Sequence, residues 1–299
     1  ATTSNFSLIS DVYWISGGLG EYRNGNTYYP ASNGLAPQSV QGDFPDYNGG
    51  RTVKDVPSGQ RKIVPSHRGS LTLTFDKNVV DEVGTTVTVF RYTGTATQGT
   101  WENIGGEVDM KKHTVTVPFD DFGYFKVMKL RRGYNDITNH NWARNILNAL
   151  YSKGIMASLR ADAFGADDQT TRGEFATLLV KGLNLPLNFN KNEQTFFDIV
   201  YGAQSATWSF EYIETAARAG IVTGRSEGFF DPGMPITREQ AAVMIARALK
   251  LKLGTNDEKL NASLAKAFLD SGSMDVYSRP AILAVSGAKI MSGIASVLP

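Results

Sequence analysis

The sequence of 299 residues contains no cysteine and only three histidines. Without thiols the chain has neither disulfides nor thiolate metal sites, which excludes disulfide scaffolds and cysteine-ligated zinc modules. His67, His113 and His140 are isolated, with no metal-ligand spacing among them. Neither a P-loop nor a G-x-S-x-G sequence occurs. We therefore expect that the protein is not an enzyme.

The net charge is small, and long apolar runs are absent. The formal net charge is +1 at pH 7, so no global field favours nucleic acid or a membrane surface as partner. No apolar run of about eighteen residues is present, and we expect no membrane insertion. The start, ATTSNFSLIS, lacks methionine and a signal-peptide pattern. We expect a secreted protein from which the signal peptide has been removed.

The chain divides into two halves of different pattern. Four segments before residue 134 alternate in period two and are rich in Val, Thr, Phe and Tyr, which predicts strands at 70–75, 85–93, 113–119 and 123–130. Residues 5–15 are a further strand candidate. This pattern predicts an antiparallel β-sandwich-like domain over residues 1–134. Beyond it, Ala and Leu at helical spacing predict an all-α domain over residues 135–299.

Residues 17–68 form a long insertion rich in Gly, Asn, Pro and Tyr that fits neither pattern. Within it, Asp43, Asp46 and Asn48 stand before glycines and offer oxygen ligands, so a weak calcium site is one candidate. An EF-hand glutamate is missing from this stretch. The tyrosines of the insertion form a sugar-binding or subunit interface, or they pack locally, which is the favoured interpretation.

The second half contains an internal repeat. Equivalent positions in its first two copies lie 66 residues apart: Trp142 and Trp208, Gly154 and Gly220, Phe164 and Phe230, and Arg172 and Arg238. In a third copy, at an offset of 69, Tyr277 takes the place of Trp208 and Gly293 that of Gly224. The copies are predicted at about 135–187, 195–253 and 266–299, and the third has its first helix but lacks its second.

The second helix of each complete copy begins in the same way. Thr171 and Thr237 are each followed three residues later by Glu or Gln, which predicts a capping box. Arg172 and Arg238 occupy the first helical position, where a cation opposes the helix dipole at a cost of ~0.3–1 kcal/mol. An anionic ligand would offset that cost, since helix N–H groups and a guanidinium suit a carboxylate. The alternative is an internal carboxylate from Asp167, Asp168 or Asp231.

Aromatic residues and glycines recur at fixed repeat positions. Trp142 and Trp208 precede the first helices, where each either stacks on a sugar ring or packs in the core. The glycines are predicted to adopt positive φ at helix C-termini, and Gly224 and Gly293 would also let a ligand approach the backbone. The full set comprises Gly154, Gly220, Gly224 and Gly293.

These motifs resemble the S-layer homology family over about residues 135–299. The second copy carries FFDIV at 196–200, Trp208, GIVTG at 220–224, FFDP at 229–232 and ITRE at 236–239. The first copy carries Asp136, Trp142, GIM at 154–156, Phe164 and TTRGE at 170–174. Departures from the family pattern include Ser158 in place of a glycine and the absence of a Thr-Arg motif in the third copy.

The resemblance implies three repeats that close a pseudo-threefold helical bundle and bind an anionic secondary cell-wall polysaccharide at a bacterial surface. We expect the ligand to contact Arg172, Arg238, Trp142, Trp208, Thr171, Thr237, Gly224, Tyr277 and Gly293. One alternative is a self-assembling subunit of an S-layer or extracellular filament, in which the incomplete repeat and an N-terminal strand interlock between subunits. A weaker alternative is a wall-anchored enzyme acting on glycans.

Overall fold

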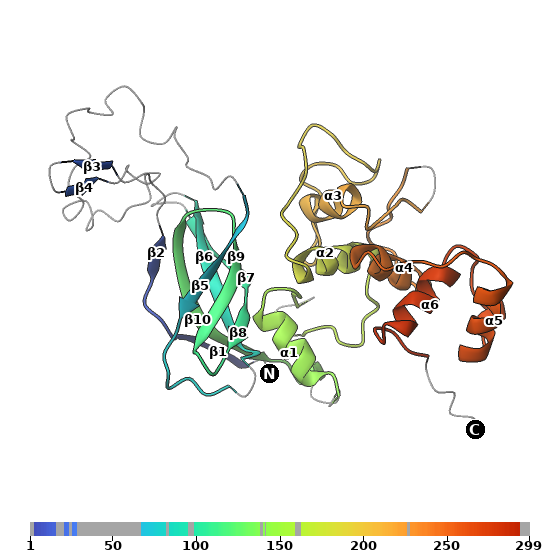
Figure 1. Cartoon of the computed structure of the whole chain (residues 1–299), viewed down its shortest axis with the longest axis horizontal. Helices are drawn as coiled ribbons and strands as arrows, with labels where there is room; N and C mark the ends of the chain where they lie inside the picture. Colours follow the sequence, from blue (N-terminus) through green and yellow to red (C-terminus); the bar gives the residue numbers. More distant parts are fainter. Residues whose placement is uncertain are drawn as a thin grey trace. The chain divides into compact units, whose positions relative to one another are not determined.

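The computed structural model describes residues 3–15, 21–23, 26–28, 67–81, 84–94, 99–137, 140, 142–158, 163–225 and 228–293. The chain is divided into two compact units, the first Ala1–Met156 and the second Ala157–Pro299. Figure 1 shows sheets in the first unit and helices in both. The predicted presence of both β-sheets and helices is confirmed.

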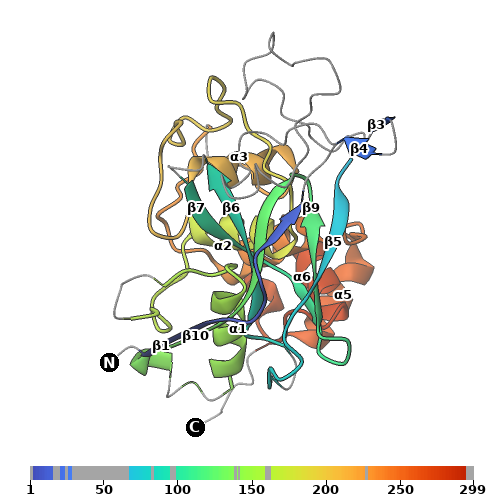
Figure 2. The ribbon, with the colours of Figure 1, turned by 90° about the vertical axis from the view of Figure 1, so that its left-hand side faces the viewer.

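Two antiparallel sheets build the first unit (Figures 1 and 2). One has the order β1-β10-β6-β7, with β2 also paired to β10, and its strands are β1 (Thr3–Leu8), β2 (Tyr13–Ile15), β6 (Val87–Gly94), β7 (Gly99–Gly105) and β10 (Gly123–Gly133). The other has the order β5-β9-β8, with β5 (Gly69–Thr74), β8 (Glu107–Asp109) and β9 (Thr114–Phe119). In a separate two-stranded sheet, β3 (Glu21–Arg23) pairs antiparallel with β4 (Asn26–Tyr28).

The core of this unit lies where the two sheets turn their apolar faces to a common cluster. Alternate residues of a strand face the same side, so each strand contributes every second side chain, among them Val87, Val89, Val115, Val117, Phe125 and Val127. Burying each such side chain contributes roughly 1.5–3 kcal/mol. The four predicted strands are confirmed as β5, β6, β9 and β10, and the candidate at residues 5–15 is divided between β1 and β2. Strands β3, β4, β7 and β8 had not been predicted.

Five α-helices occupy the described part of the second unit: α2 (Arg172–Gly182), α3 (Phe210–Arg218), α4 (Arg238–Ala248), α5 (Glu258–Ala267) and α6 (Arg279–Gly287). A short 3-10 turn, η3 (Ser271–Ser273), precedes α6. The second helix of each copy packs on the first helix of the next, α2 on α3 and α4 on α6, and α5 also contacts α6. The repeat is therefore visible in the packing as well as in the sequence.

Helix α1 (Arg144–Ser152), the first helix of the first copy, belongs instead to the first unit and packs along β10. It follows a 3-10 turn, η2 (Asn135–Ile137). The hydroxyl of Ser152 donates to the carbonyl of Leu130, and Asn103 Nδ2 donates to the Ser152 carbonyl at 2.8 Å. The last turn of α1 is thus hydrogen-bonded to the sheet. The boundary expected at residue 134, where the repeats begin in the sequence, stays a prediction.

Lys153, directly after α1, adds a buried polar contact to the same sheet. Its Nζ donates to the carbonyls of Val87 and Gly106, the second at 2.8 Å. Burial lowers the pKa of the Lys153 amine to about 8, and the charge of Asp81 opposes this shift. The contact therefore fixes α1 at the expense of desolvating a cation.

The repeat glycines divide into two kinds. Gly154 and Gly220 have φ of 70° and 72° at helix ends, as predicted, and Lys289 adopts φ of 58° at the equivalent place in the third copy. For Gly224 and Gly293 the prediction of positive φ was wrong. A Cβ on Gly224 would lie 3.0 Å from the Phe229 carbonyl oxygen, so a glycine here allows the backbone at Phe229 to pack closely against residue 224.

Candidate functional site

Both predicted capping boxes are present at the second helices. Thr171 Oγ1 accepts from the N–H of Glu174, and the Glu174 carboxylate accepts from the N–H of Thr171 at 2.8 Å. Thr237 and Gln240 make the same reciprocal pair at α4, at 3.2 and 3.5 Å. These bonds satisfy N-terminal N–H groups of each helix, so both threonines have a structural role, and their predicted ligand contacts stay predictions.

Arg172 is buried, with 4% of its surface exposed. Its Nε donates to the Phe230 carbonyl at 2.9 Å and one terminal nitrogen donates to Gln240 Oε1 at 3.0 Å. The guanidinium also lies 4.9 Å from the centre of the Phe230 ring, within cation–π range. Burial lowers the pKa of this guanidinium, Arg225 acts in the same direction, and Asp231 opposes both. Its contacts in the structure are therefore internal ones.

A loop of the next copy, residues 230–234, closes over the start of α2. The N–H groups of Arg172 and Gly173 donate to the carbonyls of Met234 and Pro232, both at 2.9 Å. The carboxylate of Asp198 holds this loop from the other side, because it accepts from the N–H groups of Phe230 and Asp231 at 2.8 and 2.7 Å. The helix N-terminus of the first copy is thus satisfied by protein backbone.

Arg238, the equivalent residue of the second copy, is exposed. Among the described residues its guanidinium makes one hydrogen bond, to the Ser292 carbonyl at 2.6 Å. No carboxylate lies within 4.0 Å of either Arg172 or Arg238 in the described part of the chain. The charges of Asp231 and Asp198 nevertheless favour the charged form of Arg172, without a direct ion pair.

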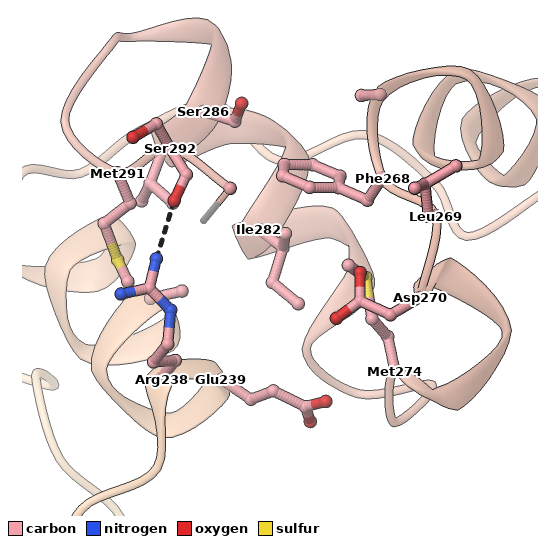
Figure 3. Close-up of a pocket in the computed structure, with 14 residues that line it drawn as sticks. Arg238, Glu239, Phe268, Leu269, Asp270, Met274, Ile282, Ser286, Met291 and Ser292 are labelled. Atoms are coloured by element: carbon pink, nitrogen blue, oxygen red, sulfur yellow. Dashed lines mark hydrogen bonds between the residues drawn. The ribbon is translucent and has the colours of Figure 1, made fainter. Parts of the chain in front are cut away.

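Arg238 borders a groove between α4, α6 and the α5–η3 segment, with a volume of about 760 Å³ (Figure 3). Its lining is largely apolar and includes Ala242, Phe268, Met274, Ile282, Val285 and Met291. Three charged residues also line it, Arg238, Glu239 and Asp270. Figure 3 shows Arg238 at one side and Asp270 across the groove, with Ile282 between them.

Asp270 is a groove residue that the sequence reasoning missed. It ends the Phe268-Leu269-Asp270 triplet, which matches Phe196-Phe197-Asp198 of the second copy at an offset of 72, three residues more than the offset of 69 that relates Tyr277 to Trp208. The repeated Phe-Xaa-Asp pattern was the available signal. Asp198 uses its carboxylate to hold backbone N–H groups, whereas Asp270 lines the groove.

The other carboxylate of the groove, Glu239, is engaged with the third copy. It accepts from the N–H of Asp275 at 3.3 Å and from the hydroxyl of Ser278 at 3.2 Å. Tyr277 stands in the same turn and is 57% exposed. Desolvation raises the pKa of the Tyr277 hydroxyl, and the charges of Glu239 and Asp275 raise it further.

The predicted site residues fall into three places. Arg238 and Gly293 line the groove, and Tyr277 stands in the turn whose residues Glu239 holds. Trp208 is part-buried against Gly173, where an added Cβ would lie 2.8 Å from the indole, and Gly224 lies against Phe229. Trp142 lies in the first unit, with 82% of its surface exposed. Residues that the repeat makes equivalent thus differ in their surroundings within their own units.

The calcium candidates Asp43, Asp46 and Asn48 lie outside the described residues, so this site stays a prediction. Across the described ranges, no cluster of three or more His, Asp or Glu side chains is arranged to hold a metal ion. None of the helices in those ranges has the length and apolar character needed to cross a membrane.

Comparison with known families gives a match to the S-layer homology domain at residues 133–176 and 203–242. The matched ranges include Trp142, Arg172, Trp208 and Arg238, and the resemblance to this family seen in the motifs is confirmed.

Curated relatives fall into two groups. The chain is 26% identical over 207 residues to an amylopullulanase of Thermoanaerobacterium thermosulfurigenes, covering 69% of this chain and 10% of the relative. It is 28% identical over 163 residues to an endoglucanase of Bacillus sp. strain KSM-635, covering 54% and 16%. To the S-layer protein EA1 of Bacillus anthracis it is 29% identical over 139 residues, covering 46% and 15%. The chain therefore spans only a small part of each relative.

Proposed function

From the premise that the chain carries two S-layer homology repeats, we propose that it is a cell-surface protein held noncovalently to the bacterial wall. The repeats bind an anionic secondary wall polysaccharide, and the first unit is displayed outside. Binding occurs in the groove between α4 and α6, with Arg238 as the residue that pairs with the acidic group of the ligand.

The observation that carries this proposal is the groove of about 760 Å³ that Arg238, Asp270 and Phe268 line together. The surroundings of Arg172 are closed by residues 230–234, which supply carbonyls to its guanidinium and to the first N–H groups of α2. Arg238 is exposed beside a groove of about 760 Å³. A ligand in that groove therefore meets a guanidinium that retains donors for a carboxylate.

The closed site also indicates which polar groups suit the open one. In the loop around Arg172, the Phe230 carbonyl accepts from the arginine and the Phe230 N–H donates to Asp198. Arg172 and Asp198 together therefore bind both an acceptor and a donor of the backbone. Arg238 and Asp270 both line the groove and offer one donor group and one acceptor group to a ligand. An acidic sugar with an acceptor for Arg238 and an N–H or O–H for Asp270 fits these groups, and its apolar ring face fits Phe268 and Ile282.

Co-sedimentation with purified walls tests this proposal. Arg238→Gln is expected to weaken binding at least tenfold, because it removes the guanidinium that pairs with the ligand. Arg247→Gln is the matched control, since it makes the same charge change on the exposed far end of α4. Walls stripped of their secondary polysaccharide should not retain the chain. Equal retention of both variants would refute the role of the groove.

The second candidate is a self-assembling subunit of an S-layer or filament. Exposed apolar side chains support it, since Leu269 is 96% exposed and Trp142 82% exposed, and one group of relatives consists of S-layer proteins. Sedimentation velocity over a wide range of concentrations tests it. A monomer throughout, in the presence and absence of wall polysaccharide, would exclude this candidate.

A further inference from the structure

The side chain of Gln240, in the first turn of α4, accepts two hydrogen bonds through a single oxygen. Its Oε1 accepts from the Thr237 N–H at 3.5 Å, which is the reciprocal bond of the capping box, and from the Arg172 guanidinium at 3.0 Å. An amide oxygen has two lone pairs and can serve both donors. The bond from the charged guanidinium is the shorter and the stronger of the two, so Arg172 has the larger part in fixing this side chain.

The equivalent side chain of the first copy makes a different set of contacts. Glu174, at the same position of α2, accepts from the Thr171 N–H at 2.8 Å and uses its second oxygen for the hydroxyl of Thr207 at 2.8 Å. Each of the two side chains thus ties its helix to another copy, but the capping bond at α4 is the longer one. The first turn of α4 therefore depends more on a contact from outside its own helix.

Arg172 is itself held firmly enough to fix that turn. Besides Gln240, it donates to the Phe230 carbonyl at 2.9 Å and to the Thr223 carbonyl at 3.4 Å, and only 4% of its surface is exposed. Burial is the main cause that raises the pKa of the Tyr277 hydroxyl, and the charge of Arg172 opposes the rise. Residues of all three copies therefore interact with this guanidinium.

The turn that contains Gln240 also forms one side of the groove. Arg238, Glu239 and Ala242 line the groove from α4, and the first two directly precede Gln240 in the chain. Glu239 also accepts from the hydroxyl of Ser278 at 3.2 Å, at the start of α6. A change in the first turn of α4 would therefore displace Arg238 relative to the opposite side of the groove.

We propose that Arg172 is a positioning residue for wall binding, which acts through Gln240 to hold Arg238 in place at the groove. The inference rests on the proposed function, because it concerns the groove in which the ligand binds. Arg172 makes no contact with the ligand. It raises the affinity because a first turn of α4 that is already fixed loses less conformational freedom when Arg238 pairs with the ligand.

Gln240→Met tests the contact without changing the buried arginine. Methionine keeps the length and the helix propensity of the side chain but has no oxygen acceptor for Arg172. Co-sedimentation with purified walls should show about fivefold weaker binding, and hydrogen exchange of residues 238–240 should become faster. The matched control is Gln204→Met, the same change at an exposed residue of the second unit, which should bind as the unchanged chain does.

A double-mutant cycle separates the positioning of Arg238 from a general loss of stability. In the Arg238→Gln background, Gln240→Met should have no further effect, because no guanidinium is left to position. Weakening by the same factor in both backgrounds would overturn the proposal. Unimpaired binding by Gln240→Met beside weak binding by Arg238→Gln would also overturn it and leave the proposed function standing, whereas unimpaired binding by both variants would refute the proposed function as well.

Arg172→Lys tests whether the effect originates at the arginine. The variant keeps the positive charge but lacks the planar fork that reaches the Phe230 carbonyl and Gln240 together. It should weaken wall binding by the same factor as Gln240→Met, and the double variant should bind no more weakly than either single one. If Gln240 acted only as the cap of its own helix, the two losses would multiply, and the role of Arg172 would be refuted.

Discussion

Arg172→Ala and Arg238→Ala are the same substitution at equivalent positions, and the structure predicts different outcomes. At Arg172 the change removes hydrogen bonds of 2.9 and 3.0 Å from a buried cation, and a weaker one of 3.4 Å to the Thr223 carbonyl. Hydrogen bonds from charged groups contribute roughly 1.5–3 kcal/mol each. Removing the guanidinium also relieves the desolvation that lowers its pKa. We expect a net loss of about 2–4 kcal/mol from the second unit.

Arg238→Ala removes one hydrogen bond from an exposed side chain, and such surface changes alter stability by about 0.5 kcal/mol. Hydrogen exchange of the α2 and α4 amides measures both effects within the second unit. That readout suits a chain of two compact units, whose global unfolding need not be two-state. Equal destabilisation by the two substitutions would refute the difference in burial on which the reasoning rests. A binding test should therefore replace Arg238 alone.

Three further results are expected. Burial lowers the pKa of Lys153 in the folded chain to about 8 from 10.5, so between these two pH values the unfolded chain binds the proton more strongly. The free energy of unfolding of the first unit should therefore rise by up to ~3 kcal/mol between pH 8 and 10.5. In Lys153→Met the urea midpoint should lack this rise. Gly173→Leu forces a side chain onto Trp208 and should cost the second unit ~1–3 kcal/mol or more, seen as a lower Tm. Thr171→Ala removes the cap of α2 and should lower the opening free energy of that helix, measured by hydrogen exchange, by ~1 kcal/mol. The control Thr255→Ala changes an exposed loop residue and should leave that free energy unchanged.

The local features of the fold followed from the sequence because short-range chemistry determines them. Thr171 and Thr237 cap their helices as the pattern predicted, and alternating residues place Val87 and Val89 in the core. Helix α5 was missed, although Asp257 caps it and Leu260 and Leu264 form its buried strip. Strand β7 was missed; it begins and ends at glycines, which are typical of turns.

The burial of Arg172 was out of reach of the sequence. A loop about sixty residues further along the chain reaches back to Arg172. At the 69-residue offset, the counterpart of this loop for Arg238 lies outside the described residues. The attachment of α1 to the sheet is equally nonlocal, since Asn103 and Leu130 supply its partners. Repeat periodicity predicts equivalent positions, but tertiary contacts decide which of them face solvent.

The central claim is that the groove beside Arg238 binds wall polysaccharide while the equivalent site at Arg172 is closed by the chain. Hydrogen exchange with and without purified polysaccharide measures this directly. Slower exchange is predicted at residues 238–242 and 291–293, which border the groove, with no change at residues 172–176. Protection confined to residues 172–176, or none at either place while the chain stays bound to the polysaccharide, would contradict the account.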